Sequence, residues 1–405
     1  MKRKMRKLIS LLAVTAMMFS LAGCGSSSSD TETTAAAAET TAAETAAAET
    51  EATDDTTSAD TESEAVASSS DNELIMIDRE KAATGELTAD ELGVTVTSTD
   101  QVTLIWAHNG SSQSASSKGY EYMEQLIEEA SGGNIQVEVY PDSELGTSTE
   151  INQNLKANTV QIGCGNVGGL VDDTLAYFDM NGAITSREDA LLLTEPGTEV
   201  REYTEDVFNE LGFELLVLTP YGFRVTSSNK ALNSFEDLAG LDIRVTENNV
   251  QMAFWSACGA NPTPLAFNDL YVSLQQGLVD AQENPYNTIV TNKFYEVQDY
   301  VTETNHQMFV AGIWMNKECY DSLPADYQEL IKAAAQAAAD YLYQLGIDEE
   351  QNAKDELEAE GVTLISWTDE DYAKVLEAGK SCWDLIRELA GDEPVDMVIN
   401  ALGIE

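Results

Sequence analysis

A long tract near the N-terminus of this 405-residue chain cannot build a hydrophobic core. Residues 25–70 consist almost entirely of Ser, Thr, Ala, Glu and Asp, and they include no aromatic side chain. Such a composition buries too little apolar surface to offset the conformational entropy lost on folding, so we expect this tract to be disordered. The folded part must lie downstream, where about 304 residues from Val102 onward are enough for a large two-lobed unit.

The first 24 residues have the pattern of an export signal. Five Lys or Arg residues occupy the first seven positions, and the apolar run 8–21 that follows is too short to span a bilayer comfortably. The run ends in Leu21-Ala22-Gly23-Cys24, which resembles the lipobox of bacterial lipoproteins. The resemblance implies that residues 1–23 are a lipoprotein signal peptide and that Cys24 carries a lipid. An uncleaved membrane helix and an ordinary signal with a chance cysteine are the alternatives.

Residues 24–100 are predicted to form a lipid-anchored, disordered acidic linker. Between Cys24 and Asp78 the chain carries 14 acidic residues and no Lys or Arg. A flexible tether of roughly 70 to 80 residues reaches on the order of 50 Å, and charge repulsion extends it further. The alternative is an interaction or glycosylated tail, and the segment 74–100 could add a short strand or a loose arm. We therefore expect an extracytoplasmic protein held at the cell membrane.

The charge of the chain limits its partners. The formal net charge is -50, and from Val102 to the end 52 acidic residues face 14 basic ones. Such a field repels polyanions, so nucleic acid and anionic lipid head groups are not expected partners. A monomer without a cofactor is the simplest expectation.

The segment from Val102 onward alternates strand and helix patterns and predicts an α/β fold with short connections. Pro324 suits a helix start, and the Ala-rich stretch after it predicts one long helix or two, ending near Gly361. The other predicted strands are 102–107, 134–140, 159–163, 213–218, 223–227 and 241–245, and the other predicted helices are 117–130, 148–157 and 268–277.

The cysteine and histidine residues give little support to metal or redox chemistry. No C-x-x-C pair occurs, and only His108 and His306 are available to complete a zinc site. A calcium site built from distant carboxylates stays possible, although no D-x-D-x-D-G loop is present. Disulfides and buried free thiols are both open for the four downstream cysteines, which are Cys164, Cys258, Cys319 and Cys382.

Two motifs suggest enzymes, and neither is complete. Residues 163–168 match G-x-G-x-x-G after a predicted strand, but the segment before Glu188 is a poor second strand for a dinucleotide-binding unit. We interpret the motif as a glycine-rich loop at a strand end. The cluster of His108, Ser111, Ser112 and Asp142 suggests a serine hydrolase, but no G-x-S-x-G turn accompanies it.

The rare arginines are more informative. Only five occur after Val102, and two of them, Arg224 and Arg244, lie in apolar, strand-like surroundings. A buried guanidinium needs an anionic partner, and its planar fork suits a carboxylate. The partner is either an acid of the chain itself, in an internal salt bridge, or the carboxylate of a ligand.

The sequence around these arginines resembles the solute-binding proteins of tripartite ATP-independent periplasmic (TRAP) transporters. The resemblance covers roughly Val102 to the C-terminus and is densest from Arg244 to Pro285. The segments that carry it are Leu238-Ala239-Gly240-Leu241-Asp242-Ile243-Arg244-Val245, Ala260-Asn261-Pro262-Thr263-Pro264-Leu265-Ala266-Phe267 and Asp280-Ala281-Gln282-Glu283-Asn284-Pro285.

The resemblance implies roles for six residues. Arg244 would pair with the carboxylate of the ligand, with Arg224 as a supporting arginine and Asn284 as an amide that bonds the same carboxylate. Phe267 would form an aromatic wall, and Asn109 and Asn166 would line the cleft from the first lobe. Thr246 and Glu247 depart from the residues usual in relatives, so the ligand's identity stays open.

The resemblance also implies an architecture and a function. The expected fold is α/β and two-lobed, like periplasmic binding proteins, with a ligand cleft between the lobes and long helices spanning both. Within the solute-binding domain 101–405, lobe 1 would comprise about 101–221 and 310–349, and lobe 2 about 222–309 and 350–405. The chain would capture a small organic acid and deliver it to membrane permease subunits. A receptor that feeds a membrane sensor and, less favoured, an extracellular enzyme are the alternatives.

Overall fold

The structure, a computed structural model, describes residues 77–404. The predicted signal peptide, Cys24 and the linker up to residue 76 lie outside the described residues. No helix in the described part of the chain is long and apolar enough to cross a membrane.

The described residues are organised around one nine-stranded sheet with the order β2-β1-β3-β8-β4-β7-β5-β6, in which β9 also pairs with β8. Its two ends are parallel, whereas the central strands β4 and β8 are antiparallel to each other and to their outer neighbours β7 and β3. The strands are β1 (Val102–Ala107), β2 (Ile135–Tyr140), β3 (Ile162–Asn166), β4 (Phe213–Ser228), β5 (Asp242–Val245), β6 (Asn261–Pro264), β7 (Ala281–Pro285), β8 (Tyr300–Asn316) and β9 (Thr363–Ser366).

The first end of the sheet, β2-β1-β3, is covered by helices whose starts the sequence marks clearly. Ser114 caps α3 by accepting a hydrogen bond from the Ser117 backbone N–H, and Thr147 forms a capping box with Glu150 at α4. In β2, buried and exposed residues alternate at its start, as expected for a strand with one covered face. The helices of this part are α3 (Ala115–Ala130), α4 (Ser148–Lys156), η2 (Asp173–Asp179), α5 (Arg187–Thr194) and α6 (Glu199–Glu210).

The second end, β7-β5-β6, carries two smaller cores of its own. Phe254 and Trp255 of α7 pack under β5, and Leu270 and Leu274 of α8 pack with Phe294. The helices of this part are η3 (Phe235–Leu238), α7 (Asn249–Ala257), η4 (Phe267–Asp269), α8 (Leu270–Gln276), α9 (Tyr286–Thr291) and η5 (Phe294–Glu296).

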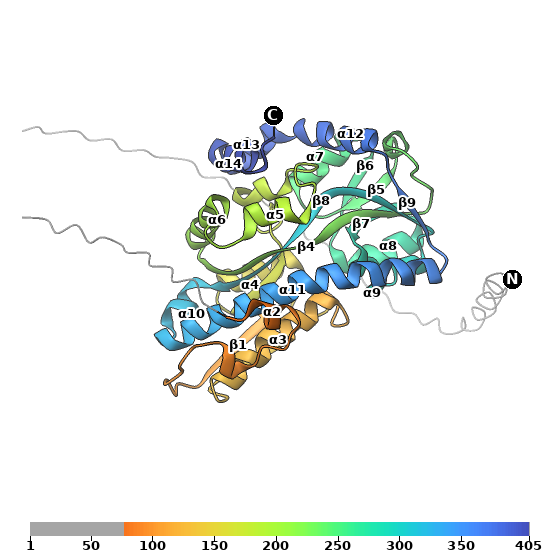
Figure 1. Ribbon diagram of the computed structural model, residues 1–405. Helices are drawn as coiled ribbons and strands as arrows, with labels where there is room; N and C mark the ends of the chain where they lie inside the picture. The colour runs from red at the N-terminus through yellow and green to blue at the C-terminus, as the bar shows by residue number, and fades with distance from the viewer. Residues whose placement is uncertain (1–76, 405) are drawn as a thin grey trace, which may run out of the picture. The chain divides into compact units, whose positions relative to one another are not determined.

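Three long elements join the two parts: β4, β8 and the 35-residue helix α11 (Ala325–Ala359), which α10 (Lys317–Ser322) precedes. In Figure 1, α11 runs along both parts, with β1 and α3 below it and β4 and β7 above it. It begins after Pro324 and ends before Gly361, which has a left-handed φ of 89°. Only a glycine fits at position 346, because an added Cβ would lie 2.0 Å from the Tyr221 carbonyl oxygen. The predicted α/β fold, two-lobed with a long helix that contacts both parts, is thereby confirmed. The stretches 213–218 and 223–227, expected as two strands, form the single strand β4.

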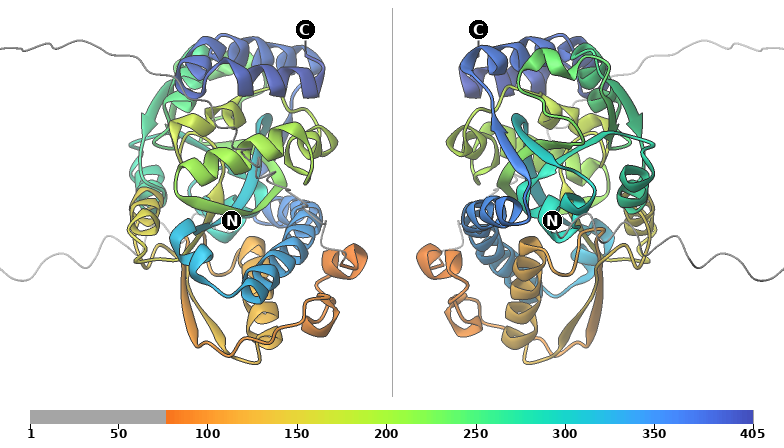
Figure 2. Two further views of the ribbon diagram at one scale, coloured as in Figure 1. Left: turned by 90° about the vertical axis from the view of Figure 1, so that its left-hand side faces the viewer. Right: turned by 90° about the vertical axis from the view of Figure 1, so that its right-hand side faces the viewer.

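The residues just before β1 correct the expected linker boundary at residue 100. Residues 77–100 include α2 (Arg79–Ala83) and η1 (Ala89–Glu91), and Ala82, Leu87 and Leu92 are buried in the main core. Arg79 forms an ion pair with Asp340 of α11 at 2.6 Å, and Figure 2 shows this N-terminal arm beside α11. Apolar side chains spaced along the arm supply the packing surface that the upstream tract lacks.

The C-terminal helices extend from one part of the fold to the other. α12 (Asp369–Lys380) packs on α7 and β8, but α13 (Trp383–Ala390) and α14 (Asp392–Leu402) pack on η2, α5 and α6. Ile386, Val395 and Val398 join the same core as Phe208. The end of the chain is therefore not confined to the second lobe, which corrects the predicted assignment of residues 350–405 to that lobe.

Candidate ligand-binding site

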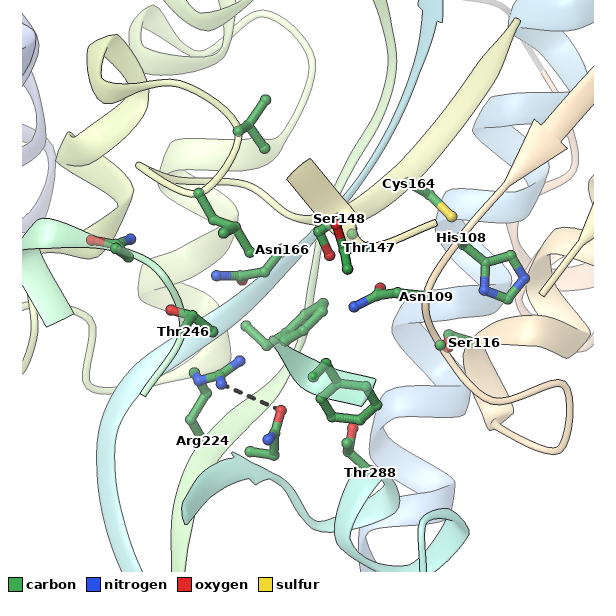
Figure 3. A pocket seen from close by; sticks show the side chains of 18 of the residues that line it. His108, Asn109, Ser116, Thr147, Ser148, Cys164, Asn166, Arg224, Thr246 and Thr288 are labelled. Atoms are coloured by element: carbon green, nitrogen blue, oxygen red, sulfur yellow. Dashed lines mark hydrogen bonds between the residues drawn. The ribbon is translucent and has the colours of Figure 1, made fainter. Parts of the chain in front are cut away.

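A cavity of about 150 Å³ lies between the two parts of the sheet and is lined by residues of both. All six residues that the sequence pointed to line it, and Figure 3 shows Asn109, Asn166 and Arg224 among them. Asn109 follows β1, Asn166 ends β3 and Phe267 follows β6, whereas the other three lie within strands. Strand ends converge here because the parallel strands β1, β3 and β6 have their carboxyl ends at the cavity.

Arg244 of β5 carries a buried charge that forms no salt bridge with an acid of the described chain, although Glu283 and Glu247 attract it from a longer distance. Its Nε and Nη2 atoms donate to the Leu265 carbonyl oxygen at 3.0 and 2.7 Å. Its Nη1 atom is buried without a hydrogen-bond partner among the described residues, and the residue is only 2% exposed. Burial lowers the pKa of Arg244 to about 10, so the side chain stays cationic near neutral pH. The Phe267 ring lies 6.0 Å from its guanidinium carbon. An unpaired buried cation is costly, so this geometry favours an anion at Nη1.

Arg224 of β4 is equally buried, but its charge is balanced internally. Its Nε and Nη2 atoms donate to the two carboxylate oxygens of Glu283 in β7, the latter at 2.9 Å. His306 adds a contact of 3.2 Å to the same carboxylate. Burial would raise the pKa of Glu283, but Arg224 and His306 hold it at about 2. The internal salt bridge considered for both arginines therefore forms at Arg224 and not at Arg244.

The three asparagines differ in how much of their hydrogen-bonding capacity the chain uses. Asn284 accepts from Arg224 Nη2 at 3.3 Å and donates to Gln282 Oε1 at 2.7 Å, so one Nδ2 hydrogen remains for a ligand. The Asn166 carbonyl accepts from the Val310 backbone N–H at 3.1 Å, which leaves its Nδ2 group for a ligand. Asn109 points into the middle of the cavity in Figure 3.

Sequence reasoning missed a buried carboxylate on the cavity wall. Asp179 accepts hydrogen bonds from the Gly169 backbone N–H at 2.7 Å, Asn248 Nδ2 at 2.8 Å and Gln307 Nε2 at 2.7 Å. Burial raises its pKa. The network joins η2, α7 and β8, and Gln251 extends it by donating to Gln307 Oε1 at 2.7 Å. These residues are far apart in sequence, so no local motif predicts their network.

The glycine-rich motif serves this carboxylate. Gly168 has a φ of 157°, and an added Cβ would lie 2.7 Å from Asp179 Oδ1. The last glycine of the motif therefore makes room for an internal side chain, in keeping with a glycine-rich loop at a strand end.

The residues of the suspected hydrolase cluster do not assemble a catalytic relay. His108 is buried, burial lowers its pKa to about 4, and its Nε2 atom has no hydrogen-bond partner among the described residues. Asp142 instead accepts from the Ser112 backbone N–H at 3.2 Å. All four cysteines of the described chain are free thiols, and within residues 77–404 no group of three or more His, Cys, Asp or Glu side chains is placed to hold a metal ion.

Residues 106–389 match the family described as bacterial extracellular solute-binding protein, family 7. The C4-dicarboxylate-binding periplasmic protein DctP of Rhodobacter capsulatus is 26% identical over 302 residues, which cover 74% of this chain and 88% of that protein. A TRAP periplasmic solute-binding protein structure from Ochrobactrum anthropi is 29% identical with a TM-score of 0.68, and the alignment covers 76% of this chain and 96% of that one. The sugar acid binding protein DctPAm of Advenella mimigardefordensis, in complex with galactonate, has the same fold, with a TM-score of 0.72, 23% identity and coverage of 76% and 99%.

A two-lobed α/β fold with a cavity between its parts and an unpaired cation in that cavity suits a protein that binds a small anionic solute. The chain belongs to family 7 of the bacterial extracellular solute-binding proteins, the family of TRAP transporter binding proteins. The predicted recognition of this family is confirmed, and so is the prediction that the chain is a transport protein and not an enzyme. Its place of action is extracytoplasmic.

Proposed function

We propose that this chain captures a small organic acid by its carboxylate, with Arg244 as the residue that pairs with it. The observation that carries the proposal is Arg244, a cationic residue that lines the cavity and whose buried Nη1 atom has no partner among the described residues. A ligand carboxylate would supply the missing charge and the missing acceptor together.

The neighbours of Arg244 fit supporting roles. Asn284 and Asn166 can each donate an amide hydrogen, and Phe267 closes one wall beside the guanidinium. Arg224 is proposed to act indirectly, because its salt bridge to Glu283 fixes β4 against β7 and it holds the Asn284 carbonyl, which orients the Asn284 amide. Asn109 would contact the part of the ligand that faces the first lobe.

The relatives support this ligand class. One is named for binding C4-dicarboxylates, and solved structures are described with bound succinate, L-gulonate and D-erythronate. Each of these ligands has a carboxylate, which is the group that the Arg244 site requires. Family membership supports delivery of the captured acid to the membrane permease subunits of a TRAP transporter.

We further propose that the protein is a lipoprotein attached through Cys24. The support is the sequence alone, with its basic start, apolar run and Leu21-Ala22-Gly23-Cys24. Replacing Cys24 with Ser should release the protein from the membrane fraction, whereas retention of the variant in that fraction would contradict a lipid anchor.

The direct test of the function is binding followed by uptake. Purified full-length protein should show a rise in its thermal unfolding midpoint with short carboxylic acids and none with their amides, because only the native state binds. Deleting the gene should then abolish uptake of the acid that binds. Unimpaired uptake together with loss of a signalling response would favour the receptor alternative.

A further inference from the structure

The two sides of the cavity differ in charge. One side carries Arg244 and Arg224, whereas the side formed by the end of β1, the start of α3 and β3 carries His108, Asn109, Ser116 and Cys164. Figure 3 shows these four residues across the cavity from Arg224 and Thr246. The amide of Asn109, the hydroxyl of Ser116 and the buried thiol of Cys164 are uncharged, so the charge of this side of the cavity depends on His108.

His108 is a neutral side chain with an unused hydrogen-bonding atom. It is 2% exposed and packs edge-on against Tyr120, with ring centroids 5.1 Å apart. Its Nε2 atom is buried and lacks a partner among the described residues. Burial lowers the pKa of this imidazole to about 4, so it is uncharged near neutral pH. A ligand hydroxyl can pair with Nε2 in either tautomer, because it both donates and accepts, whereas a carboxylate can only accept.

The Oε1 atom of Gln251 is a second unused atom, and it can accept a hydrogen bond from a donor on the ligand. Gln307 Nε2 lies 3.4 Å from the Phe178 carbonyl oxygen, which can only accept, and 2.7 Å from Asp179 Oδ1, so the oxygen of Gln307 is directed at Gln251. Gln251 must then donate through Nε2, which leaves its Oε1 atom buried and without a partner among the described residues. A hydroxyl satisfies this oxygen, whereas a carboxylate would be repelled by it.

The ionisable residues around the cavity leave one cation available, which can pair with a single ligand carboxylate. Four Arg, Asp or Glu side chains line it: Arg224, Arg244, Asp179 and Glu247. Arg224 is paired with Glu283, Asp179 is held by three donors, and Glu247 is exposed. Of these charges, only that of Arg244 is a cation without an anion. A second carboxylate would lose its hydration among uncharged groups and gain no ion pair in return.

We propose that the ligand is a hydroxylated monocarboxylate, with its carboxylate on Arg244 and its hydroxyls on His108 Nε2 and Gln251 Oε1. This inference rests on the proposed carboxylate site and adds the chemistry of the rest of the ligand. A cavity of about 150 Å³ matches the volume that holds a molecule of roughly benzene's size, so a short acid of about four to six carbons fits.

The test compares acids that differ only in their second end. Oxidising the terminal hydroxymethyl group of D-erythronate to a carboxylate gives meso-tartrate, and D-gluconate and D-glucarate form the same kind of pair. Titration calorimetry on the purified full-length protein should show about tenfold or greater preference for a monocarboxylate over its paired diacid. Equal or tighter binding of the diacids would overturn this inference and leave the carboxylate site standing. Failure of every acid in both series would contradict the carboxylate site itself.

Two variants test the assignment of the uncharged side. His108→Phe keeps an aromatic ring against Tyr120 and removes both nitrogens, so it should weaken binding of the preferred hydroxy acid about tenfold. The same variant should change the affinity for butyrate, which lacks hydroxyls, much less, and equal loss for both acids would overturn the hydroxyl contact.

Asn109→Arg places a cation on the uncharged side and should shift the preference toward the paired diacid. An unchanged preference in a folded Asn109→Arg protein would count against the charge argument.

Discussion

Arg224 and Arg244 are both almost fully buried, and each lies about 6 Å from the ring of a phenylalanine, yet only one of them is free to bind an anion. Arg224 forms an ion pair with Glu283, whereas Arg244 is bonded only to a backbone carbonyl. The chain has 71 acidic residues, so an unpaired buried arginine is the exception that requires an explanation. The contrast shows that exclusion of the chain's own acids is what makes a binding site here.

The order of the strands produces the difference. β7 lies between β4 and β5, and Arg224 pairs with Pro285 in β7, which brings Glu283 two residues away on the same strand. Arg244 of β5 pairs with Gln282 of β7 on one side and with Thr263 of β6 on the other, so its nearest strand neighbours are neutral. The carboxylate of Glu283 is bonded to Arg224 of β4 and acts on Arg244 only at longer range.

The largest expected effect is on stability and concerns Arg224. Arg224→Met leaves Glu283 buried without its cation and should lower the free energy of unfolding by about 3–5 kcal/mol in urea denaturation. The double variant Arg224→Met/Glu283→Gln removes both charges and should recover most of this loss. A single variant as stable as wild type would show that the salt bridge does not hold the strands together.

A comparable effect, this time on binding, is expected at Arg244. Arg244→Met removes the proposed partner of the ligand and should weaken binding of the carboxylate by about 2–5 kcal/mol in titration calorimetry. It should not lower the free energy of unfolding, because no internal ion pair is broken. Arg244→Lys keeps the charge without the planar fork and should also bind weakly. Wild-type affinity in either variant would refute the proposed role.

The two phenylalanines sharpen the comparison with a smaller effect. Phe267→Leu removes the ring beside Arg244 and should weaken ligand binding by about 0.5–2 kcal/mol. Phe309→Leu removes the ring beside Arg224, and its effect should appear in the free energy of unfolding more than in binding. Both can be measured by calorimetry and urea denaturation on the same preparations, and the reverse pattern would mean that the two arginines have exchanged roles.

The most gradual effect is a pH dependence that belongs to the Arg224 pair. The folded state holds the pKa of Glu283 at about 2, below its ordinary value of 4.5. The unfolded state therefore takes up the proton first as the pH falls, and this contribution to stability is lost between about pH 4.5 and pH 2. The double variant Arg224→Met/Glu283→Gln should have a flatter stability profile over this interval. The same slope in both proteins would assign the acid sensitivity to other groups.

Local sequence patterns predicted much of the fold. The strand 102–107 coincides with β1, and the helix expected near 117–130 begins two residues earlier because Ser114 caps it. The arm at residues 77–100 was missed as part of the folded domain because its packing partner, α11, lies more than 200 residues away. Packing between distant segments leaves no local periodicity to detect.

Two signals in the sequence predicted part of the candidate site: the rarity of basic residues and the resemblance to a known family. The rarity of basic residues and the segment from Arg244 to Pro285 pointed to six residues, and the structure gathers all six around one cavity. Asp179, Gln251 and His108 were not among them. The first two carry no signal in sequence, and His108 was considered only for a zinc site and for a catalytic relay, neither of which forms among the described residues.

The sequence by itself determined the solute-binding family, the α/β class and the presence of two arginines in apolar strands. Only the tertiary structure decided which arginine is open to a ligand, because pairing depends on which carboxylate the strand order brings within about 3 Å of each guanidinium. It also decided that the side of the cavity that carries His108 is uncharged, since burial, and not residue type, keeps His108 neutral. Residue identities are written in the chain, but the charges they carry depend on the neighbours that folding provides.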